Sequence, residues 1–305
     1  MKAIHVENIS KSYLNGKEKL EALKPLSFDV DKGELFGFIG PDGAGKTTLF
    51  RILTTLILAD SGKAFVEGLD VVNDYQKIRQ QVGYMPGRFS LYQDLSVEEN
   101  LEFFATIFNT SVKENYHLIK DIYEQLAPFA NRPAGKLSGG MKQKLALCCA
   151  LIHKPTVLFL DEPTTGVDAV SRKEFWEMLK RLKSQGITIL VSTPYMDEAS
   201  LCDRVALMQD GKFLSTDAPA NIIKNYSKTL LAVKGANMFP LLQKLKTIQG
   251  IKSAYPFGEF HHVVLEDRIL NIEKLKNELH EYGHLEIKEV QADIEDCFIY
   301  AMQNQ

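Results

Sequence analysis

The sequence predicts an α/β protein built around a mainly parallel sheet, followed by a small α+β domain. Over the first two thirds of the 305 residues, apolar stretches of strand length alternate with stretches of helical pattern, which is typical of a parallel sheet. Past about Asn225 the pattern changes to a few helical and strand-like stretches without a glycine-rich loop. We therefore expect a first domain over residues 1–224 and an accessory α+β domain over residues 225–305.

The first domain begins with short strands and then reaches a glycine-rich loop. Ile4 to Ile9 and Leu26 to Val30 are predicted strands. An apolar strand, Leu35 to Ile39, runs directly into the loop, and Thr47 to Leu56 has the composition of a helix. The loop therefore joins the end of a buried strand to the start of a helix.

Helical patterns dominate the middle of this domain, from about Arg88 to Leu151. Ser96 and Glu99 form a capping box, which marks a helix start ahead of apolar residues at helical spacing. Further along, the expected elements are a strand, a helix, a strand and a hairpin turn, at Val157 to Leu160, Ser171 to Ser184, Ile187 to Val191 and Asp210-Gly211.

Composition limits the classes of function. The formal net charge of -3 provides no basic surface, so we expect no nucleic-acid partner. The longest apolar run, Leu145 to Ile152, is far shorter than the ~20 residues that a membrane-spanning helix needs. The N-terminal MKAIHVENIS lacks the apolar core of a secretion signal. We expect a cytoplasmic protein whose four cysteines are reduced core thiols.

The glycine-rich loop, GPDGAGKTT, fits the P-loop pattern G-x-x-x-x-G-K-[ST] in the strand–loop–helix context that the motif requires. Its glycines let successive backbone N–H groups converge on phosphates, which the helix N-terminus also attracts. Lys46 is then expected to bridge the β- and γ-phosphates of ATP, and Thr47 to bind Mg²⁺. The expected nucleotide-binding residues of the loop are Gly40, Pro41, Asp42, Gly43, Ala44, Gly45, Lys46, Thr47 and Thr48.

A second motif, VLFLDEP from Val157 to Pro163, supplies two carboxylates. Its apolar residues form a buried strand that delivers Asp161 and Glu162 at its end. Asp161 is expected to hold Mg²⁺, and Glu162 to polarise the attacking water as general base. Adjacent carboxylates are common on protein surfaces, but here they end an apolar strand downstream of a P-loop. This context favours a catalytic role for Glu162 together with Lys46.

The stretch LSGGMKQKLALCCALIHKP contains a second phosphate cradle. Leu137, Ser138, Gly139 and Gly140 open a helix with free N–H groups and a hydroxyl. One chain has no use for two cradles on one nucleotide. Two chains packed head to tail do, because each can offer its cradle to the γ-phosphate held by the other. The sequence therefore predicts a dimer.

These motifs resemble those of the ABC ATPases, and the resemblance covers about Ile4 to Asp217. It implies an ABC ATPase domain with N-terminal antiparallel strands, a mainly parallel core and a helical subdomain at about residues 88–151, which uses ATP and Mg²⁺. Tyr13 lies where the family stacks an aromatic ring on adenine, although an ordinary half-exposed strand aromatic explains it equally well. Asp168, in TTGVDAVSR, lies where the family makes its subunit contact.

Within the family, GPDGAGKTT, FSLYQDLSVEENL, DEPTTGVDAVSR and YMDEA look most like the ATP-binding subunits of daunorubicin-resistance-type multidrug exporters. That resemblance implies ATP-driven export through separate transmembrane permease subunits, with this chain peripheral on the cytoplasmic face of the cell membrane. The helical subdomain would dock the permease, and the C-terminal domain would be accessory. A soluble ABC-type ATPase or a nucleotide-sensing regulator without a transport role is the alternative.

Two positions depart from the family pattern. Gly87 follows GYMP where the family usually has a glutamine, and Pro194 stands in STPYMDEA where a histidine would be typical. The histidine normally reaches the γ-phosphate, whereas proline offers neither charge nor donor. Both changes weaken the chain's own site, while the signature that it would offer to a partner is intact. We therefore expect a heterodimer with a second ABC ATPase subunit, in which this chain binds ATP mainly as a clamp, with a homodimer as the alternative.

His261 and His262 are adjacent in a strand-like stretch. Neighbouring residues of a strand point to opposite faces, so the two histidines do not form a metal pair. We expect both side chains to be solvated.

Overall fold

The computed structural model describes residues 1–16, 18–266 and 272–303. It divides the chain into two compact units, one of Met1–Pro219 with the last residues from Ala301, and one of Ala220–Tyr300. The division lies at the start of helix α7 (Pro219–Lys224), whereas the expected domain boundary lies at its end. Within the described ranges, no helix is long and apolar enough to cross a membrane.

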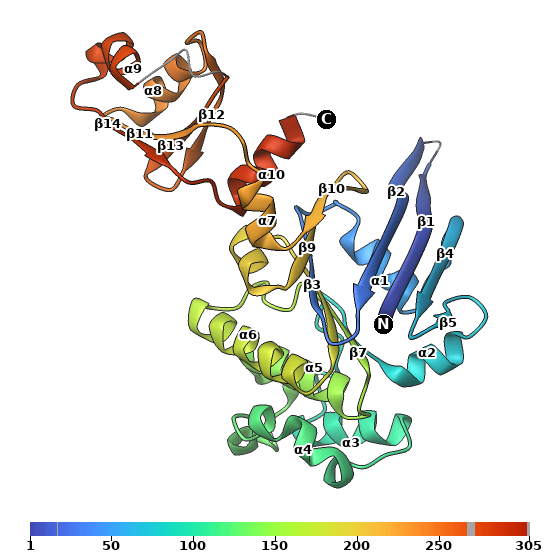
Figure 1. The fold of residues 1–305 in the computed structure, drawn as a ribbon. Helices are drawn as coiled ribbons and strands as arrows, with labels where there is room; N and C mark the ends of the chain where they lie inside the picture. The colour runs from blue at the N-terminus through green and yellow to red at the C-terminus, as the bar shows by residue number, and fades with distance from the viewer. Residues whose placement is uncertain (17, 267–271, 304–305) are drawn as a thin grey trace. The chain divides into compact units, whose positions relative to one another are not determined.

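The first unit contains two sheets (Figure 1). Its strands are β1 (Lys2–Asn15), β2 (Glu18–Asp31), β3 (Leu35–Ile39), β4 (Ser61–Val66), β5 (Leu69–Asp70), β6 (Val82–Met85), β7 (Val157–Asp161), β8 (Thr188–Thr193), β9 (Arg204–Gln209) and β10 (Lys212–Asp217). One sheet is antiparallel, in the order β2-β1-β4-β5. The other has the order β10-β9-β3-β8-β7-β6 and is parallel except for the hairpin of β9 and β10. The predicted mainly parallel core is therefore confirmed.

The helices of this unit pack on its sheets or on one another. They are α1 (Lys46–Leu53), α2 (Tyr75–Gln81), α3 (Val97–Ile107), α4 (Val112–Tyr123), α5 (Gly139–Leu151) and α6 (Ala169–Ser184), with short 3-10 turns η1 (Ala127–Phe129), η2 (Ala134–Lys136) and η3 (Met196–Leu201). Helix α1 contacts β2 and β4 of one sheet and β7 of the other. Helices α5 and α6 contact each other and, respectively, β6 and β8.

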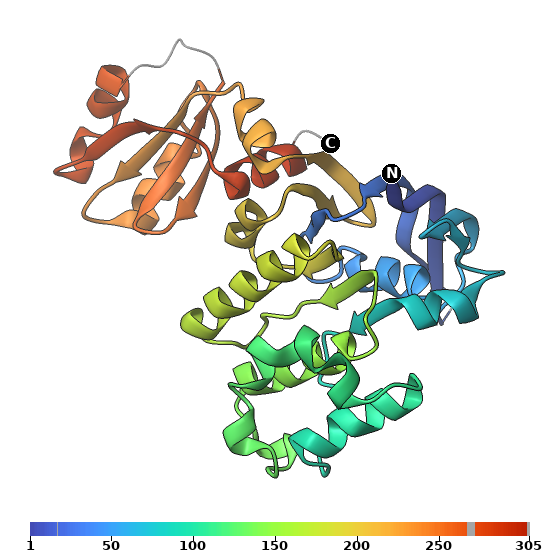
Figure 2. The ribbon, with the colours of Figure 1, turned by 60° about the horizontal axis from the view of Figure 1, so that its bottom comes forward.

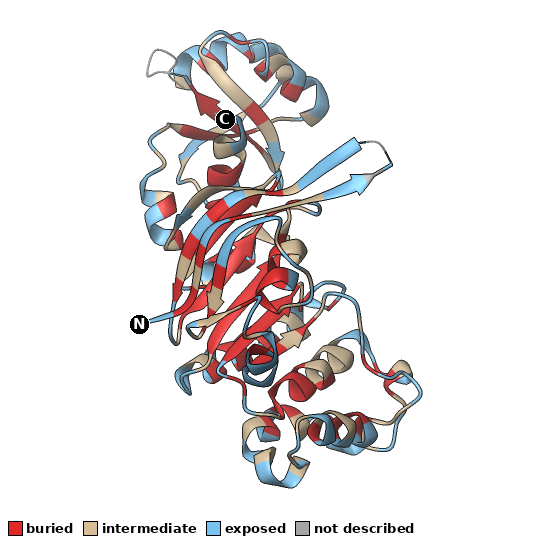
Figure 3. Cartoon of the chain, turned by 90° about the vertical axis from the view of Figure 1, so that its right-hand side faces the viewer, coloured by how far each residue is buried: buried red, intermediate tan, exposed pale blue. Residues whose placement is uncertain are grey.

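One apolar core joins α1 to both sheets. All residues of β3 are buried, and Phe38 on this strand lies edge-on to Phe28 of β2 and to Phe50 of α1, with ring centroids 5.4 and 5.6 Å apart. Phe50 in turn meets Phe159 of β7 at 5.6 Å. Figure 3 shows the strands of the parallel sheet mostly buried, whereas the far end of the β1–β2 hairpin is exposed. The loop that follows β3 thus starts from a fully buried strand.

The helical subdomain consists of α3, α4 and the start of α5 (Figure 2). The expected capping box is present: the Ser96 hydroxyl accepts from the N–H of Glu99, whose carboxylate accepts from the N–H of Ser96. Lys144 of α5 donates to Glu174 of α6 at 2.7 Å and to Gln125 after α4 at 2.5 Å. This largely buried lysine ties the helical subdomain to the helix that follows β7.

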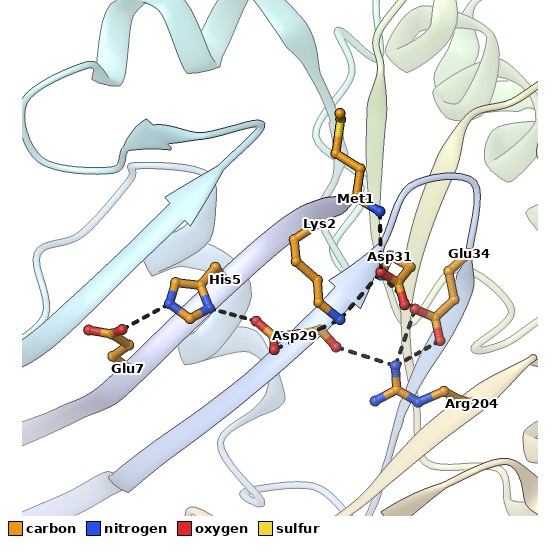
Figure 4. Close-up of polar contacts among 8 residues, drawn as sticks. All are labelled: Met1, Lys2, His5, Glu7, Asp29, Asp31, Glu34 and Arg204. Carbon is orange, nitrogen blue, oxygen red and sulfur yellow. Dashed lines mark hydrogen bonds and ion pairs between the residues drawn. The ribbon is translucent and has the colours of Figure 1, made fainter.

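Charged residues at the start of the chain join the two sheets (Figure 4). Arg204 of β9 contacts the Glu34 carboxylate at 3.2 Å and the carbonyl oxygen of Asp29 in β2 at 3.5 Å. His5 of β1 pairs with Asp29 at 2.6 Å and with Glu7 at 2.9 Å. Hydrogen bonds to these two carboxylates raise the pKa of His5. The strands here extend well beyond the short segments that the sequence predicted.

The second unit is an α+β unit with its own core. Its described elements are α7, β11 (Leu230–Lys234), α8 (Met238–Leu245), β12 (Ile251–Phe257), β13 (Phe260–Leu265), α9 (Ile272–Glu278), η4 (His280–Tyr282), β14 (Glu286–Val290) and α10 (Ile294–Gln303). The antiparallel sheet has the order β12-β13-β11-β14. Leucines of α8 and α9 pack on one face of it, around Val233 and Val263.

The expectation of solvated histidines is wrong. His261 and His262 do point to opposite faces, but both are buried. His261 bonds through Nε2 to the carbonyl oxygen of Met238 at 2.7 Å, and His262 through Nδ1 to the buried carboxylate of Asp296 at 2.6 Å. The sequence gives no sign that α10, which carries Asp296, covers this face. The four cysteines are buried and free, as predicted.

Candidate functional site

The glycine-rich loop connects β3 to α1 in one constrained shape. Gly43 and Gly45 have φ angles of 81° and 102°, in the left-handed region that favours glycine. A Cβ atom on Gly45 would lie 2.4 Å from the carbonyl oxygen of Ala22 in β2. The first turn of α1 carries no acidic residue. The positive end of the helix is therefore available to an anion.

Lys46 lies inside the loop and is almost fully buried. Its ammonium group donates to the carbonyl oxygens of Gly40 at 2.7 Å and Pro41 at 2.9 Å. The Glu162 carboxylate lies 3.6 Å away. Burial lowers the pKa of Lys46, and the nearby charges of Glu162 and Asp42 counteract this effect. The lysine thus connects the start of the loop to the carboxylate at the end of β7.

Strand β7 ends in the two expected carboxylates. Asp161 is 2% exposed, and its Oδ1 accepts a hydrogen bond of 2.5 Å from the Ser192 hydroxyl of β8. Glu162 has a φ of 50°, which turns the chain sharply after the strand. Its N–H donates to the carbonyl oxygen of Ser192 at 3.0 Å and to the Ser192 hydroxyl at 3.1 Å. One residue of the neighbouring strand therefore holds the carboxylate of Asp161 and the backbone of Glu162.

A cavity of about 620 Å³ opens over the loop. It brings together Tyr13, the loop from Asp42 to Thr48, and Glu162. Asp161 does not line it, nor do Gly40 and Pro41, whose carbonyl groups face Lys46. The remaining lining residues, which the sequence did not single out, are Leu20, Glu21, Ala22, Lys24 and Asp210.

Strand pairing explains why these additional residues reach the cavity. Leu20 is the register partner of Tyr13 in the β1–β2 hairpin. Asp210 belongs to the predicted turn between β9 and β10, where Gly211 donates its N–H to the carbonyl oxygen of Ala44 at 3.1 Å. The sequence analysis missed these residues because it predicted the second strand of the hairpin only from Leu26 onward. The pairing of Leu20 with Tyr13 could therefore not be predicted.

The signature residues form a separate cluster. Ser138 caps α5 and Asp168 caps α6, where its carboxylate accepts from the N–H of Ser171 at 3.0 Å. That hydrogen bond holds the pKa of Asp168 below its usual range. A Cβ on Gly140 would lie 2.9 Å from the Ser171 hydroxyl oxygen, so the starts of α5 and α6 are in close contact. Leu137, Ser138, Gly139, Gly140 and Asp168 do not line the chain's own cavity.

The two departures from the family pattern both adjoin the carboxylates or the loop. A Cβ on Gly87 would lie 3.2 Å from the carbonyl oxygen of Asp161 and 3.7 Å from the Cβ of Glu162. Pro194 directly follows Thr193, whose carbonyl oxygen accepts from the N–H of Gly40 at 3.2 Å. Neither position supplies a polar side chain.

A second cavity, of about 390 Å³, lies between the helical subdomain and the parallel sheet. Phe104 and Phe108 form part of its apolar wall, and Arg79 lies at its edge. Its lining also includes Tyr84, Met85 and Pro86, the residues that immediately precede Gly87. One short segment therefore runs from this groove to the end of β7.

Known proteins resemble this chain in sequence and in fold. A family model described as ABC transporter matches residues 23–165. The daunorubicin resistance ATP-binding protein DrrA2 of Streptomyces coeruleorubidus is 32% identical over 289 residues, which cover 92% of this chain and 88% of that protein. The chain belongs to the ABC transporter ATP-binding proteins.

Other relatives of this ABC ATPase extend beyond the matched part. The probable multidrug ABC transporter ATP-binding protein YbhF of Escherichia coli is 45% identical over 214 residues, which cover 68% of this chain but only 37% of YbhF. Among solved structures, a dimeric ATP-binding cassette in a post-hydrolysis state, bound to ADP and Pi, aligns with a TM-score of 0.65 at 26% identity. That alignment covers 70% of this chain and 98% of the cassette.

Proposed function

We propose that this chain binds Mg²⁺–ATP in the cavity over its P-loop and, as one half of a head-to-tail dimer, drives export through transmembrane permease subunits. Adenine would stack on Tyr13, and the phosphates would meet the N–H groups of the loop. Lys46 would bridge the β- and γ-phosphates. Two observations support this assignment: the first turn of α1 carries no acidic residue, and Lys46 is almost fully buried.

The residues at the end of β7 suit a magnesium ion. Mg²⁺ prefers oxygen ligands, and Asp161 offers a buried carboxylate while Thr47 offers a hydroxyl in the first turn of α1. When bound, the ion would neutralise charge on the phosphate oxygens. Glu162 lines the cavity beside the P-loop, where it would accept a proton from the attacking water.

The chain's own site lacks two groups that usually assist this step. A glutamine at position 87 would extend past Glu162, and a histidine at position 194 would follow the residue that holds Gly40. Gly87 and Pro194 provide neither, whereas Ser138 and Gly139 are exposed and intact. This asymmetry is the observation that carries the proposal. The chain acts mainly as an ATP-binding clamp whose signature completes the site of a different ABC subunit.

The groove beside the helical subdomain is proposed to receive the permease, which would hold the chain at the cytoplasmic face of the cell membrane. Its apolar wall would take the apolar face of a short cytoplasmic helix, and Arg79 would pair with an acidic residue on that helix. Relatives named for daunorubicin resistance and multidrug transport support an export function.

The proposal is tested by measuring ATP binding and phosphate release with the purified chain, next to a Glu162→Gln variant. We expect both proteins to bind ATP equally well. Losing one positioned polar contact commonly costs ~10²-fold in rate, so the native chain, which lacks two such groups, should already release phosphate slowly. The rates of the two proteins should therefore differ by less than about threefold. Rapid release that disappears in Glu162→Gln would instead show that two copies of this chain suffice. Absence of ATP binding would refute the assignment of the cavity.

A further inference from the structure

Ser192 contacts both acidic residues at the end of β7, through the side chain of Asp161 and the backbone N–H of Glu162. It is completely buried in β8, at the position that pairs with Asp161 in the parallel register. Its hydroxyl contacts the Asp161 carboxylate at 2.5 Å and lies 3.1 Å from the N–H of Glu162.

The direction of these hydrogen bonds is fixed by proton count. The N–H of Glu162 can only donate, so the Ser192 oxygen accepts from it. The single hydroxyl proton of Ser192 is then available to Asp161, whose Oδ1 accepts it. This bond occupies Oδ1 and sets the rotation of the carboxylate about its Cβ–Cγ bond. Hydrogen-bonded partners of this kind orient metal ligands and tune their affinity.

We infer that Ser192 is a positioning residue for the Mg²⁺ site: its hydroxyl orients Asp161 so that the remaining carboxylate oxygen is directed at the ion, and its backbone holds Glu162. The inference rests on the proposed function, because it assumes that Asp161 binds the ion. It predicts that loss of the hydroxyl weakens the contribution of Mg²⁺ to nucleotide binding, while the metal-independent binding of phosphates by the P-loop is retained.

Thr188 provides a matched control on the same strand. It lies at the other end of β8, is 1% exposed, and its hydroxyl accepts from the N–H of Gly33 at 3.0 Å. A Thr188→Val variant therefore also removes a buried, hydrogen-bonded hydroxyl from β8, but at the end of the strand that pairs with Val157 and not with Asp161. If the loss of any buried hydroxyl from β8 destabilises the strand in general, nucleotide binding should change equally in Thr188→Val and Ser192→Ala.

The experiment measures the dissociation constant of a non-hydrolysable ATP analogue by calorimetry, once with MgCl₂ and once with EDTA. Dividing the constant in EDTA by the constant in MgCl₂ gives the contribution of the metal to binding, and the measurement requires no ATP hydrolysis. We expect Ser192→Ala to reduce this ratio by about tenfold, as for other groups that orient metal ligands. Ser192→Cys, which keeps the side-chain volume and a weak donor, should lie between Ser192→Ala and the native chain, and serves in its place if Ser192→Ala does not fold.

Each outcome separates the inference from the proposed function. An unchanged ratio in Ser192→Ala, or an equal loss in Thr188→Val, would overturn the role of Ser192 alone. A native chain that binds the analogue equally well with MgCl₂ and EDTA would overturn the proposed metal site and the inference together. A native chain that binds no analogue would refute the cavity assignment itself.

Discussion

Gly87 lies beside the two acidic residues at the end of β7. Its φ lies outside the left-handed region, so the backbone does not require a glycine there. Its Cβ position lies 3.2 Å from the carbonyl oxygen of Asp161, a contact that relaxes with a shift of a few tenths of an ångström. The Cβ atom of a glutamine therefore requires only a small shift next to Glu162.

Restoring both missing groups should raise turnover. We predict that the double variant Gly87→Gln/Pro194→His releases phosphate at least about tenfold faster than the native chain, because each group adds a polar contact near the transferring phosphoryl. Steady-state phosphate release at saturating Mg²⁺–ATP measures this. The single variants show which position contributes more. A double variant that binds ATP normally but gains no rate would contradict the idea that these two positions limit the site.

Individual catalytic candidates were easier to predict than the residues that support them. Lys46, Asp161 and Glu162 stand in short motifs whose spacing fixes their place at a helix start or a strand end, and the structure brings Lys46 and Glu162 within 3.6 Å. Ser192 could not be found in this way. A serine in a buried strand has no distinctive spacing, and its contact with Asp161 depends on the register between β7 and β8.

Among the connecting elements, the turns that follow β7 and β8 are tied together by Glu198. This residue of η3 is 1% exposed, and its carboxylate accepts from the hydroxyls of Thr164 at 2.7 Å and Thr193 at 2.5 Å. Arg172, in the first turn of α6, lies 3.8 Å away. The buried carboxylate of Glu198 thus contacts three segments: the turn that follows Glu162, the end of β8 and the start of α6.

Removing this tie should cost stability. We predict that Glu198→Ala lowers the free energy of unfolding by about 2–4 kcal/mol, since it leaves buried hydroxyls without their acceptor. Urea denaturation measures the change. Asp197→Ala is the matched control, because Asp197 also lies 3.8 Å from Arg172 but its side chain is 74% exposed. It should change the stability by less than about 0.5 kcal/mol, and equal losses in the two variants would count against the tie.

At this scale, sequence patterns identified the buried elements better than the exposed ones. Strands β3, β7 and β8 are buried throughout and were predicted almost to the residue. Strand β2 begins at Glu18, but its first residues are exposed and show no apolar alternation, so only its buried end was predicted. Backbone hydrogen bonds to β1, and not apolar packing, extend this strand.

The whole assembly is predicted to place the signature of one chain over the P-loop of another. Two further variants, made in the Gly87→Gln/Pro194→His protein, separate the role of the signature from the role of the general base. Glu162→Gln removes the general base but leaves the signature, and Ser138→Arg blocks the exposed signature but leaves the base. Each should be inactive as a homodimer.

Mixing the two inactive variants should restore activity. Random pairing gives half mixed dimers, and each has one complete site out of two, so about a quarter of the activity of the Gly87→Gln/Pro194→His protein should return. Phosphate release after mixing, compared with each variant alone, measures this. No recovery despite ATP binding by both variants would contradict a site shared between two copies of this chain.

The order of the strands, unlike their positions in the sequence, could not be read from local patterns. Strand β3 lies between β8 and β9, and each of its neighbours comes about 150 residues or more later in the chain. The P-loop at its end is further held by the turn at Gly211, which bonds to the carbonyl oxygen of Ala44 and to the N–H of Lys24.

This arrangement has a consequence for synthesis on the ribosome. The P-loop sequence emerges early, but the strands that flank β3 and the turn at Gly211 are translated about 150 residues or more later. At about 5–20 residues per second, the loop waits on the order of ten seconds or longer for its neighbours. We therefore expect a nascent chain to capture nucleotide only after residue 211 has been translated, and unfinished chains to carry the motif without competing for ATP.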